Sequence, residues 1–480
     1  MAGVARGART VEMTSALRRA VPTFACLFCV LFYWRALTCP FYMDDYGWLH
    51  LGLGPHPWPA SDLLGLLFAP KAHNMIRPWS QSLFFWGLAR LFGVNPLPFH
   101  VVIFATIIAN LLLLYAIVRR LTGSIIAALG AQFFWMLNPG LGGAFAWTCL
   151  YNEPQFAFFM LLALWLFMNG RYWWQLAVFI IGLGSLEAAV MYPGVASLYA
   201  LIYDRRKLRS TLPLYLVSAG FVAAVFIWAT PAHSGPYSMH VDARIFTTLK
   251  TYVEFALGPE RFGHFHWTWP AWIISAGSVV MFLGVVAAMF AAGRAGLFGA
   301  GCFLILLAPF LVLPDHVFEF YLTGPAIGLA IALGAALASR WRVPALAFGA
   351  VYLLIAIPPA WQVTKWYYER SVLGRDLVDS VVEYNRAHPG KTLLLTGMDI
   401  DQFESSFVNI PLELYGMQNV WLAPGADAKI NDATHFAPLF VPKNARALLD
   451  SGQAVVLDVS RGAAIRDVTS IFASAPAPAR

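Results

Sequence analysis

The chain has 480 residues, of which 59% are hydrophobic and 12% are charged, and its mean hydropathy is +0.64. Soluble domains are about one quarter charged, so this composition excludes an ordinary water-soluble protein. The formal net charge is +7. The arginines and lysines gather at the ends of apolar stretches, where such residues orient a membrane protein and meet anionic lipid. We therefore expect membrane lipids, and not nucleic acid, among the partners.

Apolar stretches near the length that crosses a bilayer recur between Val21 and Ala360. In hydrocarbon such stretches must be helical, because a helix satisfies its own backbone hydrogen bonds. We predict an all-α polytopic membrane protein with about eleven transmembrane helices. The predicted spans cover residues 21–37, 98–118, 122–138, 154–169, 173–187, 190–203, 212–230, 271–291, 296–313, 322–339 and 343–360.

Basic residues cluster at alternate ends of these spans. The clusters are Arg18 with Arg19, Arg119 with Arg120, Arg171, the basic residues of 205–209, Arg294, and Arg340 with Arg342. An excess of arginine and lysine marks cytoplasmic loops, so we expect residues 1–20 in the cytoplasm and residues 361–480 outside. Residues 21–360 then form the transmembrane module, with large outer loops at 38–97 and 231–270.

The first outer loop is rich in polar and aromatic residues. Its apolar pieces at 60–69 and 78–92 are short or interrupted by charge, so we interpret them as interfacial helices that lie in the membrane plane. Such a loop would cap a cavity at the outer leaflet. Polar residues of this and other outer loops are candidates for substrate binding: His73, Arg77, Asn152, Glu153, Glu187, Glu319 and Tyr321.

Asp44 and Asp45 follow the first predicted span. One interpretation is a helix cap at a wet interface, since aspartate is a good N-cap. The other is a catalytic base, because an adjacent carboxylate pair near low dielectric has at least one raised pKa, which suits a proton acceptor. If the chain continues extended here, only one side chain of the pair can face the cavity. A divalent metal ion held by the pair is a further alternative.

Several motifs then follow one another in a characteristic order. They are Phe41-Tyr42-Met43-Asp44-Asp45-Tyr46, Arg77-Pro78, Phe92-Gly93-Val94-Asn95-Pro96, Leu137-Asn138-Pro139 and Ser185-Leu186-Glu187. Together they resemble the GT-C glycosyltransferases, and more narrowly the bacterial protein mannosyltransferase and aminoarabinose transferase group. The resemblance extends over roughly residues 20–345.

The resemblance implies a transferase that moves a sugar from a polyprenyl-phosphate donor to a hydroxyl of a lipid, glycan or protein acceptor. The reaction would take place at the outer face of a bacterial inner membrane. In that family an aspartate of the first outer loop is the general base, which corresponds to Asp44 or Asp45, and Arg77 matches a donor-phosphate cation. Leu186 stands where the family usually has lysine, and Glu319 lies near a position that is commonly basic. If the family's lysine serves the donor phosphate, another cation must take its place here.

After Trp361 the hydrophobicity falls and charged residues return. Residues 374–387 have the pattern of an amphipathic helix, and residues 391–397 and 454–459 have the pattern of short buried strands. We expect a small C-terminal α/β domain that either helps to shape an acceptor site or only stabilises the protein. The sequence identifies no certain cofactor and leaves a divalent metal ion as the one candidate.

Two other functions remain as alternatives. A transporter or flippase of lipid-linked saccharides would carry ionisable groups in the middle of its spans and show inverted repeats. A non-catalytic membrane scaffold would use the outer acids only to cap helices. In that case the acids would not converge on one cavity.

Overall fold

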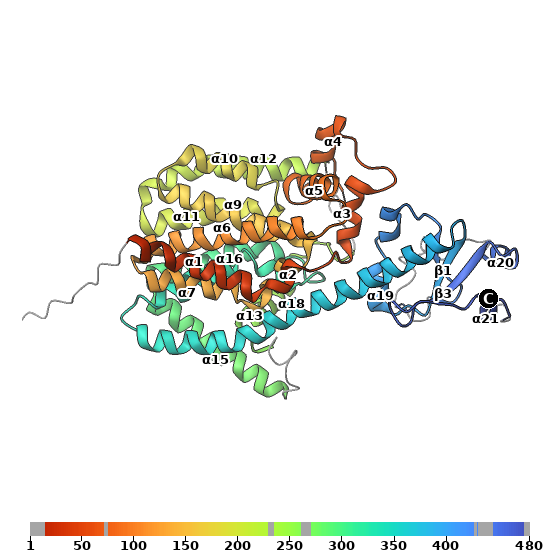
Figure 1. Ribbon diagram of the computed structural model, residues 1–480. Helices are drawn as coiled ribbons and strands as arrows, with labels where there is room; N and C mark the ends of the chain where they lie inside the picture. The colour runs from red at the N-terminus through yellow and green to blue at the C-terminus, as the bar shows by residue number, and fades with distance from the viewer. Residues whose placement is uncertain are drawn as a thin grey trace, which may run out of the picture.

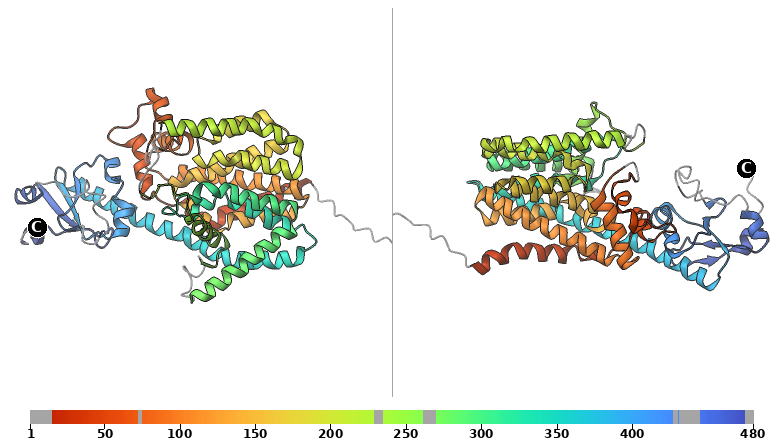
Figure 2. Two further views of the ribbon diagram at one scale, coloured as in Figure 1. Left: turned by 180° about the vertical axis from the view of Figure 1, so that it is seen from behind. Right: turned by 90° about the horizontal axis from the view of Figure 1, so that it is seen from above.

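The computed structural model describes residues 15–71, 75–228, 235–260, 270–426, 430 and 445–474. Figure 1 shows a bundle of long helices that run roughly side by side, with a smaller domain of strands and helices beyond one end. We call this end of the bundle the domain end. Helix α1 (Ser15–Phe32) begins at the opposite end, as the further views in Figure 2 also show.

A helix lies over each of the predicted transmembrane ranges. These helices are α1 with α2 (Trp34–Leu37), α6 (Leu97–Thr122), α7 (Ile125–Met136), α9 (Asn152–Met168), α10 (Tyr172–Gly182), α11 (Tyr192–Tyr203), α12 (Leu212–Trp228), α15 (Ala271–Ala291), α16 (Arg294–Leu311), α17 (Ala326–Ala336) and α18 (Arg342–Ala387). Among the described residues, 5 helices are long and apolar enough to cross a membrane, or up to 6 if one bent pair is a single span. The chain is a multi-pass membrane protein, and the number of eleven crossings stays a prediction.

Several of these helices are short because the chain breaks at their ends. Helices α10 and α17 have 11 residues each, or about 16 Å, against roughly 30 Å of hydrocarbon. Helix α7 meets η4 (Pro139–Leu141) and α8 (Gly142–Ala146) at a bend of 54°. Asn138 accepts a hydrogen bond from the Gly140 N–H (3.0 Å) and donates one to Tyr352 Oη (2.9 Å). Buried amide bonds of this kind hold membrane helices together across a break.

The first predicted outer loop folds into short helices at the domain end (Figure 1). They are α3 (Asp44–Leu53), η1 (Ala60–Asp62), α4 (Leu63–Phe68), η3 (Pro78–Leu83) and α5 (Phe84–Phe92). Helices therefore occupy both ranges that the sequence predicted as interfacial. The expectation of an extended chain through Asp44 and Asp45 was wrong, because α3 begins at Asp44. Carboxylates are favourable in a first helical turn, where they meet the positive end of the helix dipole.

The last predicted span and the predicted amphipathic helix at 374–387 are parts of one helix, α18, of 46 residues. Pro358 and Pro359 lie inside it, and membrane helices tolerate proline where neighbouring groups satisfy the freed backbone. The helix passes through the predicted domain boundary at residue 361, and Figure 2 shows it running from the bundle into the C-terminal domain. A continuous helix, and not a loop, therefore joins the two parts.

The C-terminal domain contains the predicted strands as β1 (Thr392–Thr396) and β3 (Ala454–Asp458), which pair in parallel. β2 (Val420–Leu422) is parallel to β1 and β4 (Arg466–Asp467) is antiparallel to β3, in the order β2-β1-β3-β4. Its helices are α19 (Ile400–Ser406), η9 (Pro411–Tyr415), α20 (Ala445–Asp450) and α21 (Thr469–Ser474). Leu377 and Val381 of α18 share a core with the strands, separate from the core of the bundle.

Basic residues from separate loops lie together at the end of the bundle opposite the C-terminal domain. Arg120 Nη1 donates to Asn169 Oδ1 (2.8 Å), and Lys207 Nζ donates to the last carbonyl of α9 (3.0 Å). Arg294 lies 4.9 Å from the ring centroid of Tyr203. We call this the basic end. The positive-inside rule predicts that it faces the cytoplasm.

Candidate active site at the domain end of the bundle

A cavity of about 730 Å³ lies where the first loop, the turns before α9 and α17, helix α18 and the C-terminal domain meet. The charged, amide and imidazole side chains in its wall are Asp44, Lys71, Arg77, Gln81, Asn152, His316, Glu404 and Asn409. Its aromatic side chains are Tyr42, Trp48, Trp147, Tyr237, Phe318, Phe320, Tyr321, Trp366 and Tyr367. The cavity therefore gathers residues that are far apart in the sequence.

Asp44 and Asp45 have different surroundings. Asp45 is fully buried and accepts hydrogen bonds from the backbone N–H groups of Tyr42 (2.9 Å) and Cys149 (2.6 Å). Asp44 is partly buried, lines the cavity and accepts a hydrogen bond from Asn409 Nδ2 (3.1 Å). Successive side chains on a helix point about 100° apart, so the first turn of α3 turns the two carboxylates to different partners.

Burial raises the pKa of Asp45 well above the usual aspartate value, and its two backbone hydrogen bonds offset only part of that rise. The bond to Cys149 ties the start of α3 to η5 (Thr148–Tyr151), the turn before α9. Asp45 therefore connects two segments of the cavity wall, whereas Asp44 lines the cavity.

Arg77 and Glu187 form a bidentate ion pair. Arg77 precedes Pro78 at the start of η3, as the sequence predicted, and Glu187 begins η6 (Glu187–Met191). Arg77 Nε donates to Oε1 (3.1 Å) and Oε2 (3.0 Å) of Glu187, and Nη2 donates to Oε2 (2.8 Å). Arg77 lines the cavity and Glu187 does not. The geometry makes Glu187 the residue that orients the guanidinium, and the Arg77 Nη1 group takes no part in the pair.

The other predicted binding residues are divided between the cavity wall and positions outside it. Asn152 and Tyr321 line the cavity. Glu153 is fully buried and accepts a hydrogen bond from Asn152 Nδ2 (3.3 Å), but it is not part of the lining. Glu319 begins η8 (Glu319–Leu322) and does not line the cavity either. His73 lies outside the described residues.

Lys71 is a cavity residue that the sequence analysis did not select. Its Nζ donates to the carbonyl oxygens of Leu66 and Ala69 at the end of α4 and lies 5.4 Å from the ring centroid of Trp58. Burial lowers its pKa. No motif marks this lysine, which follows α4 and lies in the wall of the same cavity as Arg77.

The long loop before α13 (Arg244–Leu257) adds Tyr237 to the cavity. The Tyr237 and His316 ring centroids are 4.1 Å apart. Burial raises the pKa of Tyr237, and among nearby charges Arg77 lowers it and Asp44 raises it. The charges of Arg77, which is predicted to hold the donor phosphate, and of Asp44, which is predicted to be the base, therefore both act on Tyr237.

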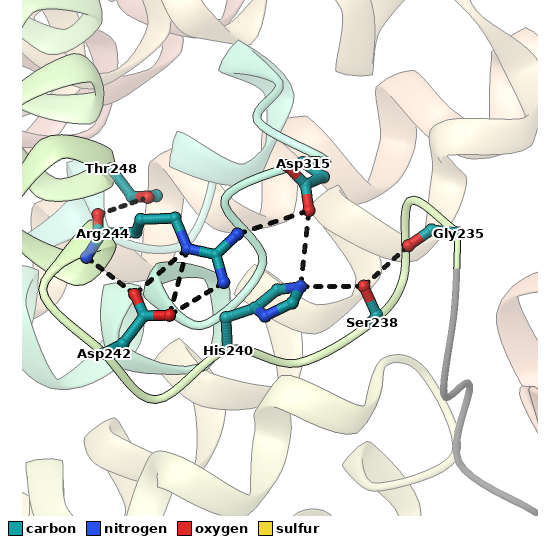
Figure 3. Close-up of polar contacts among 7 residues, drawn as sticks. All are labelled: Gly235, Ser238, His240, Asp242, Arg244, Thr248 and Asp315. Atoms are coloured by element: carbon teal, nitrogen blue, oxygen red, sulfur yellow. Dashed lines mark hydrogen bonds and ion pairs between the residues drawn. The ribbon is translucent and has the colours of Figure 1, made fainter.

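A polar network, shown in Figure 3, holds this loop in place. His240 Nε2 lies 3.0 Å from Ser238 Oγ and 3.4 Å from Asp315 Oδ2. Arg244 forms an ion pair with Asp242 (2.8 Å) and lies 3.9 Å from Asp315. The network joins the segment that carries Tyr237 to the segment before η8. It therefore places two parts of the cavity wall relative to each other.

The geometry does not favour a metal ion held by the aspartate pair. The Asp45 carboxylate is occupied by two backbone hydrogen bonds, and Asp44 is bonded to Asn409 in the cavity wall. In the part of the chain that the structure describes, no three His, Cys, Asp or Glu side chains come together as a possible metal ligand set. Ca²⁺ and Mg²⁺ need several oxygen ligands around one point.

The sequence matches no protein-family model and no curated protein sequence. Among solved structures, the chain is similar to the crystal structure of ArnT from Cupriavidus metallidurans in the apo state, with a TM-score of 0.49 and 12% sequence identity. The match covers 92% of this chain and 93% of that chain. An identity this low carries no information about which side chains act, so the function has to be inferred from the cavity itself.

Proposed function

We propose that the chain is a membrane glycosyltransferase that moves a sugar from a polyprenyl-phosphate donor to an acceptor hydroxyl. The observation that carries the proposal is that Asp44 and Arg77 both line one cavity, which is also lined by aromatic side chains. Such a reaction needs a carboxylate to accept a proton and a cation to hold phosphate. In a scaffold whose acids only cap helices, nothing would bring both groups to one cavity.

In the proposed reaction the acceptor oxygen attacks the anomeric carbon of the sugar. Asp44 accepts the hydroxyl proton as the new carbon–oxygen bond forms, and the bond from the anomeric carbon to the phosphate oxygen breaks. The lipid phosphate takes the electron pair and is held by Arg77, whose orientation depends on Glu187. The phosphate is already a good leaving group, so the main tasks of the protein are positioning and charge stabilisation.

Lys71 is the proposed second cation for the phosphate. Leu186, which stands where the GT-C resemblance leads us to expect lysine, is 2% exposed and precedes η6. Lys71 lines the same cavity as Arg77 but comes from a different part of the first loop. Burial disfavours the charged form of Lys71 and lowers its pKa. A bound phosphate would favour the charged form again, because the two opposite charges would pair.

The position of the ionisable groups supports a transferase over a transporter of lipid-linked saccharides. The groups of the cavity belong to loops and helix ends, whereas a transporter would carry them near the middle of its spans. The cavity also lies at the end of the bundle opposite the basic end. By the positive-inside rule this is the outer face, and the proposed location is the bacterial inner membrane, with a lipid, glycan or protein as acceptor.

The proposal is tested by single-turnover sugar transfer with the purified chain in lipid nanodiscs. The donors are a panel of labelled polyprenyl-phosphate sugars, and a membrane extract supplies the acceptor. We expect Asp44→Asn to lose about 10² to 10⁴ in rate while still binding donor. Asp62→Asn is the matched control, because Asp62 caps α4 in the same loop but lies outside the cavity wall.

Two outcomes would count against the proposal in different ways. A wild-type rate in Asp44→Asn would remove the base from the mechanism. A wild-type protein that transfers no sugar from any donor in the panel would reject the function as a whole.

A further inference from the structure

The C-terminal domain contributes directly to the cavity wall. Asn409, which precedes η9, and Glu404 of α19 both line the cavity, together with Trp366 of α18. One turn after Trp366, Arg370 forms an ion pair with Asp401 of α19 and lies 4.1 Å from the Trp366 ring centroid. The continuous helix α18 and the ion pair between Arg370 and Asp401 therefore hold the C-terminal domain next to the cavity.

A second set of contacts seats η9 against α3. His50 Nε2 is hydrogen-bonded to the carbonyl oxygen of Ile410 (3.2 Å), and His50 Nδ1 lies 3.9 Å from Glu413 Oε2. Gly47 lies one turn earlier on α3, and a Cβ added there would be 3.2 Å from Asn409 Oδ1. Glycine weakens a helix interior relative to alanine, so the close approach of Asn409 gives a physical reason for glycine at this position.

Unusual backbone conformations flank both partners of the hydrogen bond between Asn409 and Asp44. Across the described residues, positive φ values outside glycine occur at Met43 (50°) and Ile410 (49°). Met43 directly precedes Asp44, and Ile410 directly follows Asn409. Positive φ is costly for residues with a side chain, above all for a β-branched one, and it persists only where the surrounding structure holds it. The fold therefore keeps Asp44 and Asn409 in position despite the conformational strain at Met43 and Ile410.

We propose that Asn409 is a positioning residue for the base of the proposed reaction, so that the C-terminal domain completes the active site. The Asn409 Nδ2 group donates to Asp44 Oδ1 (3.1 Å), which restricts the rotation of the carboxylate. A hydrogen bond donated to a carboxylate also favours its ionised form, which is the form that accepts a proton. The inference rests on the proposed function, but the bond can be tested independently of catalysis.

The first test is the pH dependence of carbodiimide labelling at Asp44 in the full-length protein, read by peptide mass spectrometry. Carbodiimides react with protonated carboxyl groups, so the labelling midpoint reports the pKa of Asp44. We expect Asn409→Ala to move the midpoint to higher pH by about one unit. The other titratable groups around this end of α3 are unchanged in the variant: Asp45, Arg77, Lys71, Glu404, Tyr42, Tyr237, His316 and Cys149.

Glu413→Gln is the matched control, because Glu413 belongs to the same interface with α3 but not to the cavity wall. In Glu413→Gln the labelling midpoint of Asp44 should equal that of the wild type. Gly47→Ala keeps the asparagine but crowds it, and we expect a midpoint shift in the same direction as in Asn409→Ala. An unchanged midpoint in Asn409→Ala, in protein with a wild-type thermal melt, would overturn the proposal. If Asn409→Ala does not fold, an unchanged midpoint in Gly47→Ala would overturn it.

The second test is the pH profile of sugar transfer in the nanodisc assay. We expect Asn409→Ala to lower kcat about tenfold and to shift the acidic limb of the profile upward, with the KM for donor unchanged. If the wild type transfers sugar and Asn409→Ala has the wild-type profile, the positioning role is rejected while the proposed function stands. If the wild type transfers no sugar, the proposed function fails, whatever the labelling experiment shows.

Discussion

At the scale of single residues, Asp44 and Asp45 are identical side chains at adjacent positions, and they differ in burial and in their partners. Asp45 is fully buried against two backbone N–H groups, whereas Asp44 lies in the cavity wall beside Asn409. In the proposed reaction the carboxylate in the cavity wall accepts the proton, and the buried one connects two segments of the wall. We therefore expect substitutions at Asp44 to act on rate and substitutions at Asp45 to act on stability.

For Asp45 we predict a pH-dependent effect on thermal stability. A carboxyl group whose pKa is raised on folding keeps a proton that the unfolded chain has lost. The free energy of unfolding therefore falls as pH rises from about 4, the usual aspartate range, toward the raised pKa. Asp45→Asn does not titrate, so its melting temperature relative to the wild type should increase with pH. Melts of both proteins in detergent at several pH values measure this difference, and a constant difference would contradict the prediction.

For Arg77 we predict weaker donor binding. Arg77→Ala should cost about 2 kcal/mol, or about 30-fold in Kd, if one charge-assisted phosphate contact is lost. Arg90→Ala is the matched control, because Arg90 lies in the same loop beside Trp86 and outside the cavity wall. Equilibrium binding of a labelled polyprenyl-phosphate sugar measures the effect. Equal affinities of Arg77→Ala and the wild type would leave Arg77 with no role beyond its pair with Glu187.

For Glu187 we predict an effect that depends on Arg77. Glu187→Gln removes the charge that orients the guanidinium but no group of the cavity wall. Donor affinity should fall by less than in Arg77→Ala, and the double variant should bind no more weakly than Arg77→Ala alone. The four dissociation constants form a double-mutant cycle. Additive losses would show that Glu187 acts on the donor by a separate route.

At the scale of secondary-structure elements, the cavity depends on irregular segments that polar contacts hold in place. The loop that carries Tyr237 is joined to the segment before η8 through His240, Arg244 and Asp315 (Figure 3). The Asp315 and Arg244 side chains are 55% and 47% exposed, and pairs this exposed contribute little to stability because solvent screens the two charges. Such contacts order a loop without adding much to global stability.

We therefore predict that Asp315→Asn loosens this loop and leaves the bundle intact. Amide hydrogen exchange should become faster in residues 235–243, while the melting temperature changes by no more than about 2–4 °C. Glu254→Gln is the control, because Glu254 pairs with Lys250 along α13 (3.5 Å) and not with this network. Unchanged exchange in the loop of Asp315→Asn would mean that the network does not hold it.

At the scale of the whole molecule, helix α18 is the element that joins bundle and domain. Its 46 residues begin at the basic end, form part of the cavity wall and enter the core of the C-terminal domain. The basic end and the C-terminal domain lie at opposite ends of the molecule (Figure 1). The positive-inside rule predicts that the basic end faces the cytoplasm.

We predict that the C-terminal domain lies outside the cytoplasm, because the basic loops mark the cytoplasmic end. Alkaline phosphatase fused after Arg480 should be active, and phosphatase fused after Lys207 should be inactive. A fluorescent protein that matures only in the cytoplasm should show the reverse pattern at the same two positions. Interchanged signals at the two positions would reject the orientation and move the cavity to the cytoplasmic face.

The sequence by itself determined the features that depend on local patterns. Apolar stretches locate the membrane helices, because in lipid a continuous apolar segment has to form a helix wherever it lies in the chain. The Arg77-Pro78 helix start, the strands β1 and β3 and the amphipathic end of α18 are likewise visible in a few consecutive residues. Basic clusters predicted the sidedness by the same kind of local count.

Only the tertiary structure decided how the polar side chains combine. Asn409 and Asp44 are 365 positions apart, and Arg77 and Glu187 are 110 positions apart. The loops that carry Lys71 and Tyr237 have no periodic pattern that would reveal where their side chains point. Adjacent aspartates also have identical propensities, so the sequence cannot tell their roles apart. The first turn of α3 and the backbone N–H groups that bind Asp45 give the two side chains different surroundings. Long-range hydrogen bonds cannot be predicted from a single sequence, because each side chain can bond to many different groups. Only the packing of the helices determines which of these groups lies within reach.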